Sequence, residues 1–111
     1  MIMHWGADAA YLLGGAFLSN AVPHLVSGVT GRAFQSPFAK PPGVGLSSAT
    51  VNVLWGFANL VLAYLLLVHV GRFDLRTPQH ALALGAGLLL MSLLSARLFG
   101  RLHGGEQGAR S

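Results

Sequence analysis

The sequence contains no cysteine and very few charged residues. Without cysteine the chain can form no disulfide, iron–sulfur cluster or thiolate metal site. Only 9% of the 111 residues are charged and 53% are hydrophobic, whereas about a quarter of the residues in a soluble domain are charged. This number of charged residues is too small to cover the surface of a water-soluble domain of this length. The composition therefore predicts a single domain whose solvent is lipid.

The motifs of several large enzyme classes are also missing. The sequence has no Walker loop, nucleotide-binding glycine fingerprint, zinc-protease helix or serine-nucleophile elbow. It has no paired carboxylates for acid–base work, and its basic residues are scattered between apolar runs instead of forming a stripe that would bind nucleic acid. Any reaction would have to use histidine with neutral partners, or a cofactor that the sequence does not identify.

Three apolar segments are each close to the roughly 20 residues that cross a bilayer. They run from about residue 9 to 29, from about 47 to 70 and from about 80 to 99. The polar, glycine-rich segment 101–111 is expected to be an unfolded tail. The sequence thus predicts an all-α membrane protein with three transmembrane helices.

Residues typical of helix ends flank these segments. Those placed to begin helices are Asp8, then Ser47 and Ser48, then Thr77 with Pro78. Those placed to end helices are Gly71 and Gly100.

The connector between the first two spans, "GRAFQSPFAKPPGVGLSS", is rich in proline and glycine. Both residues weaken regular structure, so we expect a non-helical connector that lies on the membrane interface or re-enters it. The basic residues that would share a side with this connector and the C-terminus outnumber those on the other side: Arg32, Lys40, Arg97, Arg101 and Arg110, against Arg72 and Arg76. The positive-inside rule then predicts an outside N-terminus and a cytoplasmic C-terminus.

Polar residues recur at helical spacing in the first two spans, next to the connector. Residues four and seven apart share one face of a helix. One face of the first span carries Asn20, His24 and Ser27, and one face of the second carries Ser48, Asn52, Trp55 and Asn59. His24 and Asn52 each lie about five residues from the connector, or roughly 8 Å inside the span at 1.5 Å per residue. We expect the two polar faces to meet.

This pattern predicts a polar pocket with the connector as its lid. Polar and ionisable residues within membrane spans usually face a bundle interior or a cavity and are candidates for function. The candidate catalytic residues are His24, Asn20 and Asn52, with an uncharged His24 acting as proton shuttle, hydrogen-bond donor or metal ligand. The candidate ligand-binding residues are Ser27, Arg32, Lys40, Ser48, Trp55 and Asn59.

A structural alternative is open for each of these residues. Asn and His side chains often only hydrogen-bond one membrane helix to another. Ser19 or Asn20 could simply satisfy the backbone carbonyl that Pro23 leaves free. Arg32 and Lys40 could only anchor the connector at the interface.

Two further features lie elsewhere in the chain. His69 and His80, with His4, would gather at the outer end of the spans; they are weak candidates for a metal or haem site, and no metal is predicted. Pairs of small residues four apart permit close helix contact, within the chain, with a second copy or with another membrane protein. They are Ala10 with Gly14, Gly15 with Ser19, Ala81 with Gly85, and Ala83 with Gly87.

The block "NAVPHLVSGVTGRAFQSPFAKPPGVGLSSATVNVLWGFAN", from Asn20 to Asn59, resembles a family of small bacterial polytopic membrane proteins. In that family an Asn, a Pro and a His end the first span, a Pro/Gly connector follows, and an Asn and a Trp open the second. The resemblance implies a bacterial inner-membrane location and no particular activity.

Together these features predict a small inner-membrane protein with a polar site between its first two helices. The expected ligand is a lipid, a quinone or an isoprenoid; the sequence leaves open whether the protein also acts on it. The alternatives are a non-catalytic accessory subunit of a larger membrane complex and, third, a haem or metal carrier. The expected partners are the lipid bilayer and a second copy or another membrane protein, and no nucleic acid.

Overall fold

The computed structural model describes residues 5–105 as a mostly helical chain. His4, Arg110 and the part of the expected tail from residue 106 onward lie outside the described residues. The elements are α1 (Trp5–Val29), β1 (Phe34–Gln35), β2 (Leu46–Ser47), α2 (Ala49–Tyr64), the π-helical segment η1 (Leu65–Val70) and α3 (Pro78–His103). Three helices, with α2 and η1 counted as one, are long and apolar enough to cross a membrane, as the composition predicts.

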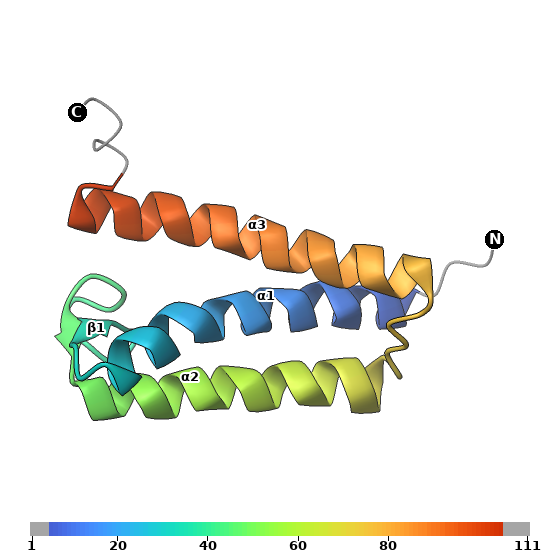
Figure 1. The fold of residues 1–111 in the computed structure, drawn as a ribbon, viewed down its shortest axis with the longest axis horizontal. Helices are drawn as coiled ribbons and strands as arrows, with labels where there is room; N and C mark the ends of the chain where they lie inside the picture. The colour runs from blue at the N-terminus through green and yellow to red at the C-terminus, as the bar shows by residue number, and fades with distance from the viewer. Residues whose placement is uncertain (1–4, 106–111) are drawn as a thin grey trace.

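The first helix is the centre of the fold. Figure 1 shows α1 between α2 and α3, and α1 makes the main contacts with both. The ribbon of α3 lies close to α1 where α3 begins and diverges from it toward the C-terminal end of α3 (Figure 1). The connector between α1 and α2 lies at this wider end (Figure 1).

The narrow end depends on glycines at the contact between α1 and α3. A methyl group added at Gly15 would overlap the backbone carbonyl oxygen of Leu84, and one added at Gly87 would overlap that of Leu12. Farther along the same contact, the Ser19 and Ser92 hydroxyls share a hydrogen bond of 2.7 Å. Close approach of this kind is how membrane helices gain packing energy where lipid provides no hydrophobic driving force.

The contact between α1 and α2 is equally close near the connector. A methyl group on Gly28 would lie 2.8 Å from the carbonyl oxygen of Ala49, and one on Gly56 would lie 3.0 Å from the backbone nitrogen of Leu25. Small residues therefore allow close contact of α1 with both α2 and α3. Gly85 of α3, by contrast, has open space around it.

The connector contains a short antiparallel hairpin in which Phe34 pairs with Ser47 and Gln35 with Leu46. The sequence predicts its non-helical character but not this pairing, because two-residue strands have no periodicity to detect. The hairpin brings the two ends of the connector together beside the ends of α1 and α2.

The structure confirms some of the helix starts that the sequence predicts. The Ser48 hydroxyl accepts a hydrogen bond of 3.2 Å from the backbone N–H of Val51, so Ser48 caps α2. Thr77 and Pro78 begin α3, although the Thr77 side chain makes no capping hydrogen bond. Asp8 is not the cap of α1, because α1 already begins at Trp5 and Asp8 lies in its first turn, where a carboxylate is favourable to the helix dipole.

The third helix ends later than its sequence suggests. Gly100 does not stop it; α3 continues to His103 and ends at Gly104, whose φ of +77° suits glycine. Residues 101–103 of the expected tail are therefore helical. The added turn contacts the connector, since His103 Nε2 lies 3.0 Å from Gln35 Oε1. At the second helix Gly71 does follow the last helical residue, as predicted.

Gly87 and Gly85 provide a matched test of the contact between α1 and α3. We expect Gly87→Ala to lower the melting temperature in detergent, because the added methyl forces apart two backbones at a cost of about 1–3 kcal/mol. Gly85→Ala should leave the melting temperature unchanged or raise it slightly, because alanine favours a helix and the site is open. Equal melting temperatures for the two variants would contradict the close contact at Gly87.

Candidate functional site

A cavity of about 610 Å³ lies at the wide end of the helices. Asn20 and His24 line it from α1, Trp55 from α2, and Phe99 and Arg101 from α3. The connector closes it with residues 35–37 and 42–44. The cavity is thus formed by all three helices together with the connector that the sequence predicts as a lid.

His24 and Asn52 form the central contact between the two polar helix faces. The His24 Nδ1 atom lies 2.7 Å from the Asn52 Oδ1 atom. Both side chains are almost completely buried, with exposed fractions of 2% and 0%. The sequence predicts this contact because His24 and Asn52 lie at the same depth in their spans, and the structure contains it.

The Asn52 amide also holds the connector. Its Nδ2 atom lies 3.1 Å from each of three backbone carbonyl oxygens, those of Phe34, Ser47 and Ser48. These carbonyls come from β1, from β2 and from the residue that caps α2. One side chain therefore satisfies backbone groups of the hairpin and at the same time positions His24.

A second pair of asparagines lies one helical turn farther from the connector. Asn20 Nδ2 donates a hydrogen bond of 3.0 Å to Asn59 Oδ1, and Asn59 Nδ2 donates one of 2.8 Å to the carbonyl oxygen of Trp55. Asn59 is completely buried. The alternative for Ser19 and Asn20 was a hydrogen bond to the backbone carbonyl that Pro23 leaves free. Both side chains instead form hydrogen bonds to other helices.

Aromatic rings surround the His24 imidazole. The rings of Phe34, Trp55 and Phe99 meet it edge to face, with centroid distances of 5.6, 6.3 and 6.4 Å. The indole Nε1 of Trp55 is buried, and no residue between 5 and 105 forms a hydrogen bond with it. The imidazole is therefore a polar group at the wall of an otherwise largely apolar and aromatic enclosure.

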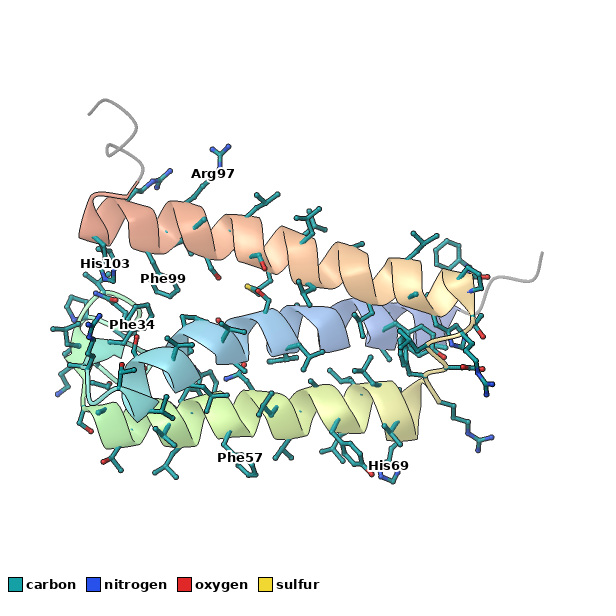
Figure 2. The ribbon with its side chains drawn as sticks, viewed as in Figure 1. Phe34, Phe57, His69, Arg97, Phe99 and His103 are labelled. Carbon is teal, nitrogen blue, oxygen red and sulfur yellow. The ribbon has the colours of Figure 1, made fainter. Side chains whose placement is uncertain are left out.

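The last turn of α3 is attached to the connector. His103 Nε2 lies 3.0 Å from Gln35 Oε1, and the His103 ring meets that of Phe34 at 5.5 Å. Figure 2 shows Phe34, Phe99 and His103 at the same end of the molecule, where α3 faces the connector. Sequence reasoning missed Gln35, Phe99, Arg101 and His103 as site residues. For Arg101 and His103 the reason is that they follow Gly100, where the sequence predicts a tail and not a helix.

Several predicted ligand-binding residues lie elsewhere. Ser48 and Asn59 form the hydrogen bonds described above and do not line the cavity. The Ser27 carbonyl oxygen accepts hydrogen bonds from the backbone of Arg32 and the hydroxyl of Thr30. Arg32 and Lys40 are exposed, and the basic residue that lines the cavity is Arg101. Trp55 is the one residue of that predicted group that the structure places in the cavity wall.

The two histidines considered for a metal are each engaged otherwise. The His69 ring packs 5.6 Å from Tyr64 and points away from α1 in Figure 2. His80 packs 4.3 Å from Tyr11, and its Nδ1 atom accepts a hydrogen bond from the backbone N–H of Asp74. Within residues 5–105 there is no group of three or more His, Asp or Glu residues that could hold a metal ion.

Two other hollows are present on the described part of the chain. One of about 840 Å³ lies between α1 and α3, and its lining includes the exposed apolar residues Val22, Val26 and Leu88. In a membrane, lipid chains can fill such a groove. The other, of about 300 Å³, lies at the opposite end beside Asp8, Tyr11 and His80. The 610 Å³ cavity differs from both in having the buried His24 in its wall.

Comparison of the chain with protein-family models, with curated proteins and with solved structures finds no match. The resemblance of the block from Asn20 to Asn59 to a bacterial membrane protein family therefore stays a prediction.

Asn52→Leu tests the role of this amide. The variant leaves His24 Nδ1 and the carbonyl oxygens of the hairpin without their partner, at about 1–3 kcal/mol for each buried group that stays unsatisfied. We expect a lower free energy of unfolding in detergent and faster hydrogen exchange at the hairpin amides. Thr50→Ala, an exposed change two residues away, serves as the control and should alter neither. Unchanged exchange in the hairpin of Asn52→Leu would show that the amide does not hold the connector.

Proposed function

We propose that the protein is a multi-pass bacterial inner-membrane protein that binds a small amphipathic molecule in the 610 Å³ cavity. The ligand class is a lipid, a quinone or an isoprenoid. In this proposal His24 and Asn20 contact the ligand, Asn52 positions His24, and Trp55 and Phe99 provide apolar walls. His24 is also the residue that would act on the ligand if a reaction takes place.

The observation that carries the proposal is a cavity of ligand size with a buried histidine in its wall. Pockets for small molecules have volumes of about 300–1,000 Å³ and are mostly apolar, with a few convergent polar groups. The cavity has about 610 Å³, and its wall combines aromatic and proline residues with His24 and Asn20. Hydrogen bonding between helices accounts for His24 Nδ1, but it does not account for the space beside the ring.

The shape of the wall favours a molecule with two different ends. His24 and Asn20 provide a polar region next to α1, whereas Trp55, Phe99 and Leu102 provide an apolar one. Arg101, which is exposed, adds a cation to the cavity wall near the end of α3. An amphipathic molecule matches this distribution better than a wholly polar metabolite does.

The orientation in the membrane follows from the basic residues. The connector lies at the same end of the molecule as the last turn of α3 (Figure 1). Arg32 and Lys40 of the connector and Arg101 of α3 are exposed. We infer that this end faces the cytoplasm and that the N-terminus lies outside, which places the cavity in the cytoplasmic leaflet. The connector then lies at the interface beside the last turns of α3.

A non-catalytic accessory subunit is the chief alternative. The small-residue pairs that favour it are largely used within the chain, because Gly15, Ser19 and Gly87 form the contact between α1 and α3. Gly85 has open space and remains available to a second copy or another membrane protein. The third function, a carrier of haem or metal, has less support, because His69 and His80 contact other residues.

The ligand proposal is tested by mass spectrometry of the organic extract of protein purified in mild detergent. Leu98 lines the cavity and Leu94, one turn earlier on α3, does not; their exposed fractions, 48% and 50%, are similar. We expect a small amphipathic molecule in extracts of the wild type and of Leu94→Trp, and at least tenfold less of it from Leu98→Trp, because the larger ring fills the cavity. Extracts with no such molecule, or equal recovery from both variants, would contradict the proposal.

The orientation is tested with reporter fusions in bacterial cells. A reporter that is active only in the cytoplasm should be active after Ser111 and inactive when inserted after Leu75, in the link between η1 and α3. An export-dependent reporter should give the opposite result at both positions. Cytoplasmic activity at Leu75 alone would reverse the orientation and place the cavity in the other leaflet.

A further inference from the structure

The hydrogen bonds around Asn52 determine which way its amide faces. The Nδ2 atom lies 3.1 Å from three backbone carbonyl oxygens, and a carbonyl oxygen only accepts hydrogen bonds. The reversed amide would place its oxygen against all three of these acceptors, with no hydrogen between the facing oxygens. Oxygen and nitrogen of an amide are assigned from such a network. The network here therefore requires that Oδ1 faces His24.

This orientation in turn determines the tautomer of His24. Asn52 Oδ1 only accepts, so the hydrogen in the 2.7 Å contact belongs to His24 Nδ1. A neutral imidazole carries one N–H, and the ring lies among the aromatic rings of Phe34, Trp55 and Phe99, where an unpaired charge would be costly. His24 Nε2 is therefore left with a lone pair, and none of the residues from 5 to 105 hydrogen-bonds to it.

The same reasoning applies to the neighbouring pair of asparagines. Asn59 Nδ2 donates to the carbonyl oxygen of Trp55, so Asn59 Oδ1 is the acceptor toward Asn20. Asn20 then donates through Nδ2, and its Oδ1 and its second N–H have no partner among the described residues. Asn20 and His24 are one turn apart on α1 and both line the cavity. The α1 wall therefore presents the His24 lone pair next to an amide that can donate or accept.

We propose that the head group bound in this cavity is a hydroxyl, carried by an apolar alcohol or phenol, which donates its hydrogen bond to His24 Nε2. The proposal rests on the proposed function, since it requires that the cavity holds an amphipathic ligand. A hydroxyl both donates and accepts, so it can also accept the second N–H of Asn20. A ketone, quinone or ether oxygen has no hydrogen to donate, and it would leave the Nε2 lone pair buried without a partner.

The preference should appear between probes that are alike except that a methyl group replaces that hydrogen. The phenol pair is 4-decylphenol and its methyl ether, 4-decylanisole; the alcohol pair is farnesol and farnesyl methyl ether. Binding is measured to the full chain in detergent by tryptophan fluorescence. The sequence has two tryptophans, and Trp5→Phe leaves Trp55, in the cavity wall, as the reporter. A hydrogen bond to a site built for it discriminates strongly against an analogue that lacks the donor.

We expect one or both hydroxyl probes to bind at least tenfold more tightly than the matching ether, and the pair that shows this identifies phenol or alcohol as the source. In His24→Phe, which removes the lone pair, we expect the two members of each pair to bind equally. If that variant does not fold, the wild-type comparison of each pair still decides the question.

Two results would overturn the inference, and they differ in what they say of the cavity. Ethers that bind as tightly as the hydroxyl probes, with binding lost in Leu98→Trp, would exclude hydroxyl recognition and still support an amphipathic ligand. No binding by any of the four probes, together with extracts that contain no ligand, would overturn both this inference and the proposed function.

Discussion

The hydrogen bonds of the Asn52 side chain are the interaction on which the wide end of the molecule depends. A non-helical segment has no helical hydrogen bonds of its own, so the backbone groups that it buries need other partners. Asn52 gives its N–H groups to carbonyl oxygens of both hairpin strands and of the α2 cap, and its oxygen receives the His24 N–H. The connector, the second helix and the histidine are therefore positioned by a single buried amide.

The cavity results from two opposite packing conditions along α1. At one end Gly15 and Gly87 let α1 and α3 approach until backbone meets backbone. At the other end bulky groups, the Phe34 and Phe99 rings at 4.8 Å, lie between α3 and the connector. A straight helix that is held close at one end and apart at the other leaves a space, and the connector closes it. Polar side chains face this space from α1, from the connector and from α3: Asn20 and His24, Gln35 and Ser36, and Arg101.

The interior of the site could be predicted from the sequence, and its outer boundary could not. Asn20, His24, Asn52 and Asn59 recur at helical spacing at matched depth, and the structure joins them in pairs. Arg32 and Lys40 were expected over the pocket because they lie in the lid, but the side chains of a loop without periodicity cannot be oriented from sequence. Gln35 and Arg101 line the cavity instead. Whether Gln35 and Arg101 line the cavity depends on how far α3 continues past Gly100.

The sequence by itself determined that the chain has three helices long and apolar enough to cross a membrane, and that two polar faces would meet. Both follow from local properties, the number of apolar residues in a run and the 3.6-residue period of a helix. Only the tertiary structure decided that α1 lies between α2 and α3, that the glycines are used within the chain and that a hairpin ends against Asn52. These features depend on contacts between residues far apart in the chain. The direction of the Asn52 amide, and hence the free lone pair of His24, exists only once those contacts are made.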